Sequence, residues 1–132
     1  MRRSEHFHLA YAGCAVLLLA CWSGCSPRQS IHDSGTMFRL RTIQTTLDAF
    51  EVDCGRYPTA SEGLPALINN PGVPGWKGPY ILIGTNTIAE VLSDEWGTPF
   101  RYVLSEGKAI ATSAGSDRTF DTGDDLMTGK PK

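Results

Sequence analysis

The sequence predicts an α+β domain in which one helix packs on a small antiparallel sheet. Two patterns predict this fold. Between residues 37 and 54, apolar residues recur every three or four positions, as on one face of a helix. Residues 100–104 and 108–112 then form two short, mostly apolar runs on either side of a glycine-containing turn, with Phe100, Tyr102 and Leu104 on one face of the first run, which is typical of a β-hairpin. The chain has 132 residues and a formal net charge of −2, so it suits one domain and is not a generically basic nucleic-acid binder.

The N-terminus has the features of a secretory signal. Arg2 and Arg3 precede an apolar run from Leu9 to Trp22. As a helix this run would be about 21 Å long, at ~1.5 Å per residue. The hydrocarbon core of a bilayer is about 30 Å thick. The run is therefore short for a membrane span and fits the apolar region of a signal peptide.

The apolar run ends in a pattern that resembles the lipobox of bacterial lipoproteins, Leu18-Leu19-Ala20-Cys21. We therefore predict a lipoprotein signal peptide over residues 1–20 and acylation of the Cys21 thiol after cleavage. Several acyl chains, at about 0.8 kcal/mol per buried CH₂, would anchor the protein stably to a membrane. Two alternatives remain open: an ordinary signal peptide, or an uncleaved anchor, because the chain carries no charge from Leu9 to Pro27.

Residues 21–36 are predicted to form a flexible tether between the lipidated cysteine and the domain, because residues 26–36 are rich in Ser, Pro and Gly. We expect His32 in this segment to be solvated. The globular domain is predicted over residues 37–132. Cys25 in the tether and Cys54 in the first helix are permitted to pair in an oxidising compartment, and the sequence leaves this disulfide open.

The first helix is predicted to begin at Met37 and to end at Gly55, with Pro58 confirming that it cannot continue. Its core face is expected to comprise Met37, Leu40, Ile43, Leu47 and Phe50.

A short second helix is predicted after the first. Thr59 and Glu62 have the spacing of a capping box. Ser61 is the alternative N-cap, because Pro65 would lie past the first turn of a helix that starts at Thr59. The apolar residues of this helix are Leu64, Leu67 and Ile68.

The rest of the domain is expected to consist of loops and short strands. Residues 81–83 are predicted as a strand and residues 84–93 as a connection. Residues 100–104 and 108–112 are predicted as a hairpin that turns at Ser105-Glu106-Gly107. One face of this hairpin, with Phe100, Tyr102 and Leu104, is expected to pack on the helix.

An acidic loop follows the hairpin over residues 113–126. It carries four carboxylates, those of Asp117, Asp121, Asp124 and Asp125. Crowded carboxylates repel each other, and a hard cation would relieve the repulsion. Ca²⁺ takes six to eight oxygen ligands at about 2.3–2.6 Å. Gly115 and Gly123 would let backbone carbonyls turn inward as well. The alternative is a solvated acidic turn.

The loop does not match two known acidic motifs. With Asp117 as the first position of an EF-hand, Thr122 and Thr128 stand where that motif needs Gly and Glu. The triplet Asp121-Thr122-Gly123 resembles the catalytic triplet of aspartic proteases, which need two facing copies, and this chain has one. The histidines all lie outside the predicted domain: His6, His8 and His32. We therefore predict no catalytic residues and no small-molecule substrate.

A series of motifs in one order resembles the G-type major pseudopilin of bacterial type II secretion. The similarity covers Phe38 to Leu126. The motifs are Leu47-Asp48-Ala49-Phe50-Glu51, Asp53-Cys54-Gly55-Arg56-Tyr57-Pro58-Thr59, Glu62-Gly63-Leu64-Pro65-Ala66-Leu67, Trp76-Lys77-Gly78-Pro79-Tyr80, Asp94-Glu95-Trp96-Gly97-Thr98-Pro99-Phe100, and Ser113-Ala114-Gly115-Ser116-Asp117 with Asp124-Asp125.

The resemblance implies a pseudopilin-like head with a structural Ca²⁺ in its C-terminal loop. Carried over by position, the carboxylate ligands are Asp117, Asp124 and Asp125, with backbone carbonyls near Ala114 and Thr119 as further candidates. Asp121 has no clear counterpart in the family and is a second-tier candidate. The ion would close a loop that otherwise repels itself.

The N-terminus departs from the family, whose members open with a basic leader, a glycine cleavage site and Phe-Thr-Leu-x-Glu. We therefore expect a non-enzymatic lipoprotein of the bacterial cell envelope that displays a calcium-stabilised head, as a structural or docking component of protein secretion. Its expected partners are a membrane, through the lipid, and secretion-system proteins. Trp22 after Cys21 favours the outer membrane over the inner, with the head in the periplasm or at the cell surface. The alternative is a degenerate pseudopilus subunit held by an uncleaved N-terminal helix.

Overall fold

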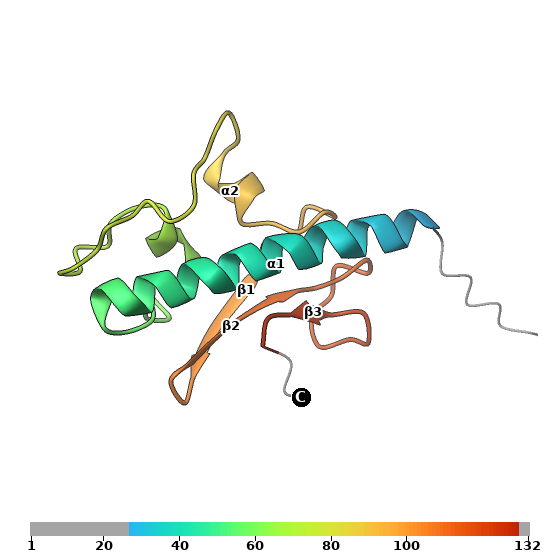
Figure 1. Ribbon diagram of the computed structural model, residues 1–132. Coiled ribbons are helices and arrows are strands. Elements are labelled where there is room, and N and C mark those ends of the chain that lie inside the picture. The colour runs from blue at the N-terminus through green and yellow to red at the C-terminus, as the bar shows by residue number, and fades with distance from the viewer. Residues whose placement is uncertain (1–26, 130–132) are drawn as a thin grey trace, which may run out of the picture.

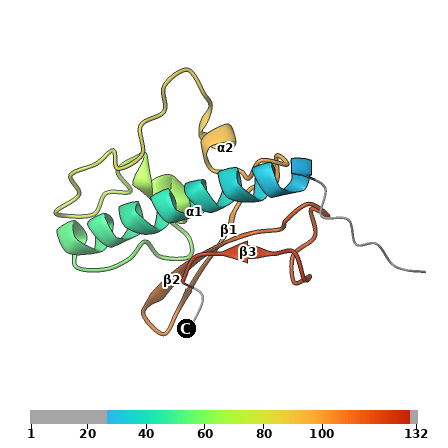
Figure 2. The same ribbon diagram turned by 45° about the vertical axis from the view of Figure 1, so that its right-hand side comes forward.

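The computed structural model describes residues 27–129, with side chains from residue 31. The elements in chain order are α1 (Pro27–Cys54), the 3₁₀ helix η1 (Leu64–Leu67), α2 (Ile88–Val91), β1 (Arg101–Ser105), β2 (Lys108–Ser113) and β3 (Leu126–Met127). The sheet lies on one side of α1, and the segment that carries η1 and α2 lies on the other (Figures 1 and 2). The predicted α+β fold is confirmed. The signal peptide, Cys21 and Cys25 lie outside the described residues.

The predicted core face of α1 is confirmed. Leu40, Leu47 and Phe50 are fully buried and Ile43 is 2% exposed, while Met37 packs partly against the same core. Burying side chains of this size contributes roughly 1.5–3 kcal/mol each. The helix ends where glycine was expected to end it, because Gly55 adopts a left-handed φ of 72°.

The prediction of a flexible tether is wrong for residues 27–36, which belong to α1. The turn at residues 94–97 holds this part of the helix in place. Thr36 is fully buried and its hydroxyl oxygen accepts a 3.2 Å hydrogen bond from the Glu95 backbone N–H. The His32 ring lies 5.8 Å from that of Trp96, so His32 is half-buried instead of solvated. Tertiary packing of this kind stabilises a helix whose Ser and Gly content disfavours it.

The length of α1 decides whether Cys25 and Cys54 can form the disulfide that the sequence left open. Its 28 residues span about 42 Å at ~1.5 Å per residue. Cys25 is two residues from Pro27, a reach of at most about 7 Å. A disulfide needs its two Cα atoms within about 7 Å of each other. Cys25 and Cys54 of one chain therefore cannot pair while α1 is formed, and Cys54 is a half-buried free thiol.

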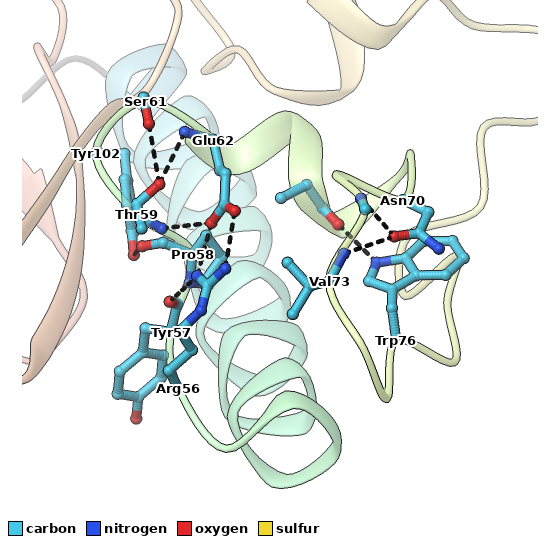
Figure 3. Close-up of polar contacts among 12 residues, drawn as sticks. Arg56, Tyr57, Pro58, Thr59, Ser61, Glu62, Asn70, Val73, Trp76 and Tyr102 are labelled. Atoms are coloured by element: carbon cyan, nitrogen blue, oxygen red, sulfur yellow. Dashed lines mark hydrogen bonds and ion pairs between the residues drawn. The ribbon is translucent and has the colours of Figure 1, made fainter.

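The predicted capping box is present, but the helix after it is shorter than expected. The Thr59 N–H donates to Glu62 Oε2 at 2.7 Å, and the Glu62 N–H donates to Thr59 Oγ1 at 3.3 Å (Figure 3). Gly63 then takes a φ of 59°, and the chain continues as one 3₁₀ turn, η1, with Pro65 near its start. Leu64 and Leu67 are buried, as predicted.

The predicted hairpin is confirmed. β1 pairs antiparallel with β2 from Arg101 opposite Thr112 to Ser105 opposite Lys108. The two turn residues, Glu106 and Gly107, have φ values of 50° and 72°, as a tight hairpin turn requires. β3 extends the sheet beside β2, so the strand order is β1-β2-β3.

The predicted strand at residues 81–83 is not formed. The N–H groups of Tyr80 and Ile81 donate to the Leu67 carbonyl at 2.8 and 3.2 Å, so this backbone packs on the end of η1 instead of pairing with a strand. Leu82 is 82% exposed. The connection that follows contains α2, which has its own capping box between Thr87 and Glu90.

Candidate functional site

The acidic loop connects β2 to β3 (Figure 2). β3 returns beside the end of β2, with Leu126 opposite Ser113. The two ends of the loop are therefore fixed by the sheet, and the carboxylates between them are confined to a small volume.

A buried carboxylate anchors the first residues of the loop. Asp94, 3% exposed, accepts a 2.6 Å hydrogen bond from the Ser113 hydroxyl. The same hydroxyl oxygen accepts a 3.1 Å hydrogen bond from the Gly115 N–H. Gly115 has a φ of 67°, and a Cβ there would lie 2.5 Å from the Asp124 carbonyl oxygen. Only glycine fits this close approach between the two ends of the loop.

Asp124 is the best-satisfied carboxylate of the loop. It accepts hydrogen bonds from the Thr122 hydroxyl at 2.7 Å, the Ser116 hydroxyl at 2.9 Å and the Asp117 N–H at 3.1 Å. These donors, the Thr122 hydroxyl first, favour the charged form and lower the pKa of Asp124 to about 2. Asp124 is therefore ionised throughout the physiological range.

The other two predicted ligands each accept a hydrogen bond from another backbone N–H of the loop. The Asp117 carboxylate accepts a 2.8 Å hydrogen bond from the Thr119 N–H, and Asp125 accepts one of 2.8 Å from the Asp121 N–H. The loop thus joins Asp117 to Asp124 through the Asp117 backbone N–H, and Asp125 is linked to Asp124 through the Thr122 hydroxyl, which contacts both carboxylates, at 3.4 and 2.7 Å.

The second-tier candidate, Asp121, is neutralised by the protein itself. Its two oxygens accept hydrogen bonds of 2.7 and 3.1 Å from the Arg101 guanidinium, which lowers the pKa of Asp121. The Arg101 Cζ also lies 4.5 Å from the centre of the Phe120 ring, within cation–π range. Arg101 therefore fastens the middle of the acidic loop to β1.

The donor chemistry of the loop suits Ca²⁺, because the candidate ligands are all oxygens. Their arrangement is less complete: among residues 27–129, no three carboxylate, imidazole or thiol side chains gather closely enough to hold a metal ion. Asp117, Asp124 and Asp125 each accept a hydrogen bond from within the loop, and Asp121 accepts its bonds from Arg101 of β1. The calcium site stays a prediction.

Two residues that shape the site were not singled out from the sequence. The role of Asp94 in its turn could have been predicted, because an Asp that opens a turn commonly accepts hydrogen bonds from the N–H groups of the residues that follow. Here Asp94 accepts them from Trp96 and Thr98. Its bond to Ser113 joins residues 19 positions apart, which no local pattern reveals. The pairing of Arg101 with Asp121, 20 positions apart, is likewise a product of the sheet.

Within the part of the chain that the structure describes, no helix is both long enough and apolar enough to cross a bilayer.

The chain matches a protein-family model described as "Type II secretion system (T2SS), protein G" over residues 29–128. Among curated proteins, the chain is 34% identical over 86 residues to the type II secretion system core protein G of Klebsiella michiganensis, covering 64% of this chain and 59% of that protein. It is also 34% identical over 86 residues to the protein of the same name from Dickeya chrysanthemi, covering 64% and 55%. The chain thus spans less than two thirds of the length of these relatives.

A solved structure supports the fold. The crystal structure of the major pseudopilin from the type 2 secretion system of enterohaemorrhagic Escherichia coli superposes with a TM-score of 0.62 and 24% identity, covering 77% of this chain and 90% of that one. At this identity the likeness speaks for the fold alone. The matched family segment begins within α1 and ends just after β3, so it includes the acidic loop.

Proposed function

Because the chain belongs to the type II secretion system protein G family, we propose that it is a structural, non-enzymatic part of a bacterial protein-secretion system. The observation that carries the proposal is the family match over residues 29–128, nearly the whole described chain. The family is a structural pseudopilin component and not an enzyme family. Affinity purification of the full-length chain from its own cells should recover other secretion-system proteins. Recovery of general lipoprotein machinery alone would count against the proposal.

The acidic loop is proposed to hold a structural Ca²⁺ through Asp117, Asp124 and Asp125. Support comes from the all-oxygen donor set and from the contact between Asp117 and Asp124. The bound ion would supply positive charge where the loop concentrates negative charge. A protein that binds Ca²⁺ only when folded melts at a higher temperature in its presence.

The calcium proposal is tested by melting the full-length chain with added Ca²⁺ and with EGTA. The expected result is a higher Tm with Ca²⁺, and loss of that difference in Asp117→Asn. The matched control is Asp121→Asn, which breaks the bond to Arg101 but removes no proposed ligand. The control should melt lower in both buffers and keep the calcium-dependent difference. Equal melts of the unchanged chain in the two buffers would exclude a structural ion.

Membrane attachment is proposed through acylated Cys21, which precedes the described residues. Acyl chains on this cysteine would hold the head beside a membrane. The intact mass of the protein extracted from membranes tests this proposal. A species that begins at Cys21 and carries added acyl mass supports it, and an unprocessed chain without lipid overturns it.

One observation favours a second candidate function, a pseudopilus subunit held by an uncleaved N-terminal helix. The helix α1 already begins at Pro27, so the described domain is not joined to the preceding apolar run by a tether as long as residues 21–36. The same mass measurement separates the two functions, because a filament subunit of this kind would keep its apolar N-terminal run.

A further inference from the structure

A continuous uncharged stripe runs along the face of α1 that points away from the core. Its members follow each other at alternating steps of four and three residues, the spacing of a helix that packs along another helix. They are Ile31, Gly35, Phe38, Thr42, Thr45, Ala49 and Val52. All but Gly35 are exposed, and the three large ones, Ile31, Phe38 and Val52, are 71%, 72% and 83% exposed. A pattern sought in strictly apolar residues misses this stripe, since two of its positions are threonine.

Most of the stripe is uncovered within residues 27–129. Gly35 lies against the Glu95 side chain, and Phe38 and Thr42 border a cavity beside α2 that Ala89 and Glu90 also line. In Figures 1 and 2 the sheet covers one side of α1 and the segment with η1 and α2 covers another. From Ile31 to Val52 the stripe is about 32 Å long at ~1.5 Å per residue. Exposed Phe, Ile and Val aligned over that length form an interaction surface more often than isolated apolar residues do.

Charged residues beside the stripe indicate what it binds. Arg41 and Asp48 each precede a stripe residue by one position, and they are seven residues apart, so both lie on the same flank of the helix. The Asp48 carboxylate is held there by the Gln44 amide at 2.9 Å and the Tyr57 hydroxyl at 3.1 Å. One flank therefore carries a cation in its first half and an anion in its second half.

We propose that this face binds the same face of a second copy of the chain, with the two α1 helices antiparallel and crossing near Thr45. A two-fold axis at Thr45 brings the same flank of both helices together. Arg41 then faces the partner's Asp48, and Asp48 faces the partner's Arg41, giving two equivalent ion pairs. Phe38 lies against the partner's Val52, so the largest exposed apolar residues are covered.

A parallel pair in register lacks this complementarity. In a parallel pair, the flank that carries Arg41 faces the opposite flank of the other helix. The residues of that flank nearest to Arg41 are Arg39 and Thr46. Arg41 would then gain no carboxylate partner there, because Thr46 is uncharged and Arg39 is a cation already paired with Glu95 at 2.9 Å. Charges beside a helix seam select orientation in this way. Because one pair of helices is a small contact and its ion pairs are exposed, the dimer should be weak and dependent on protein concentration.

The antiparallel pair goes beyond the proposed secretion role, because it places the two N-termini at opposite ends. Neighbouring copies in one filament have their α1 helices pointing the same way, so they cannot form the antiparallel pair. The pair is thus a state of the protein outside any filament, and assembly would have to break it.

The proposal is tested by replacing Phe38 with p-benzoylphenylalanine in the full-length chain, in membranes and in detergent, and mapping the photo-cross-linked peptides. The expected product is a dimer joined from residue 38 to the segment around the partner's Val52. Val103, 43% exposed on β1, is the matched control position and should give no such product. A link to the segment around residue 38 or residue 45 would show parallel neighbours and overturn the proposal, as would the absence of any dimer.

Charge substitutions supply a second, independent readout. Arg41→Asp should lower the yield of the residue 38 to residue 52 cross-link by about fivefold, since it turns two exposed attractions into repulsions. Adding Asp48→Arg should restore the yield. The two residues are seven positions apart on their own helix and face the same way, so such a rescue reports a contact between copies. A double variant that stays as low as the single one, while melting as a folded protein, would contradict the pairing.

Discussion

The carboxylate of Asp94 accepts a 2.6 Å hydrogen bond from the hydroxyl of Ser113, and both residues are buried. Asp94 also accepts hydrogen bonds from the N–H groups of Trp96 and Thr98 at 3.1 and 2.8 Å. One side chain therefore fixes two features at once. It shapes the turn that packs on the first half of α1, and it anchors the residue from which the acidic loop departs.

Asp94→Ala should destabilise the protein by about 3 kcal/mol. The substitution leaves one hydroxyl and two N–H donors without their acceptor, at about 1 kcal/mol each. Urea unfolding followed by circular dichroism measures the loss. Ser113→Ala should cost less, and the double variant should cost less than the two single losses added together, because both remove the same hydrogen bond. Simple additivity would mean that this bond contributes nothing.

Thr36→Val should destabilise the protein by about 1–2 kcal/mol at constant side-chain shape. Thr36 is fully buried, and its hydroxyl is the acceptor for the Glu95 N–H. The control, Thr85→Val, changes an exposed threonine and should be near neutral. Thermal unfolding compares the two variants. If both are neutral, residues 32–36 are not held by the turn at 94–97.

The sequence was sufficient where local chemistry decides the structure. The period of α1, its glycine stop, the Thr59–Glu62 box and the Glu106-Gly107 turn were all predicted and are confirmed. The sequence was insufficient where contacts between residues far apart in the chain determine the structure. Residues 27–36 have the composition of a linker and become helical because Glu95 and Trp96 pack against them. Residues 81–83 have the composition of a strand and stay irregular, because the carbonyl of Leu67 accepts the N–H groups of Tyr80 and Ile81 at the start of this segment.

In the acidic loop, too, the local features could be predicted from the sequence and the long-range contacts could not. Its carboxylates and glycines are visible in the sequence, and the structure places Asp117 beside Asp124. The partners that fix the loop, Asp94 and Arg101, come from other elements and are close only because β1, β2 and β3 form one sheet.

Acid should weaken the contribution of Glu62 to stability. The bidentate hydrogen bonds from Arg56, at 2.7 and 2.8 Å, and the bond from the Thr59 N–H lower the pKa of Glu62 to about 2 (Figure 3). A carboxylate with a depressed pKa contributes its full stability above its unfolded pKa of 4.5, and the contribution is lost as pH falls towards 2.

Glu62→Gln should therefore lower the Tm by about 3–6 °C at neutral pH, and the difference from the unchanged protein should shrink steadily between pH 4.5 and pH 2. The difference between the two proteins is the informative quantity, because Asp124 titrates in the same window. A gap that stays constant with pH would show that the charge on Glu62 does not stabilise the fold.

Arg101→Lys should loosen the acidic loop while leaving the core intact. Lysine keeps the charge but cannot make the paired 2.7 and 3.1 Å contacts to Asp121 or stack as a plane on Phe120. Backbone amides of residues 117–125 should exchange with deuterium several-fold faster than in the unchanged protein, and those of α1 should not change. Unaltered exchange in the loop would show that Arg101 does not restrain it.

Gly75→Ala should destabilise the protein far more than Gly72→Ala, although both glycines have the same left-handed φ of 88°. At Gly75 an added Cβ would lie 2.4 Å from the carbonyl oxygen of Asp53, at the end of α1. At Gly72 the Cβ would meet nothing within 4 Å, so its cost is the backbone penalty alone, about 1 kcal/mol. The clash at Gly75 can be relieved only by moving the 72–76 loop off the helix end, where Lys77 and Tyr80 also bind the Asp53 carboxylate. In urea unfolding we expect Gly75→Ala to lower the free energy of unfolding by about 3 kcal/mol or more. Equal losses in the two variants would mean that the 72–76 loop does not pack on α1.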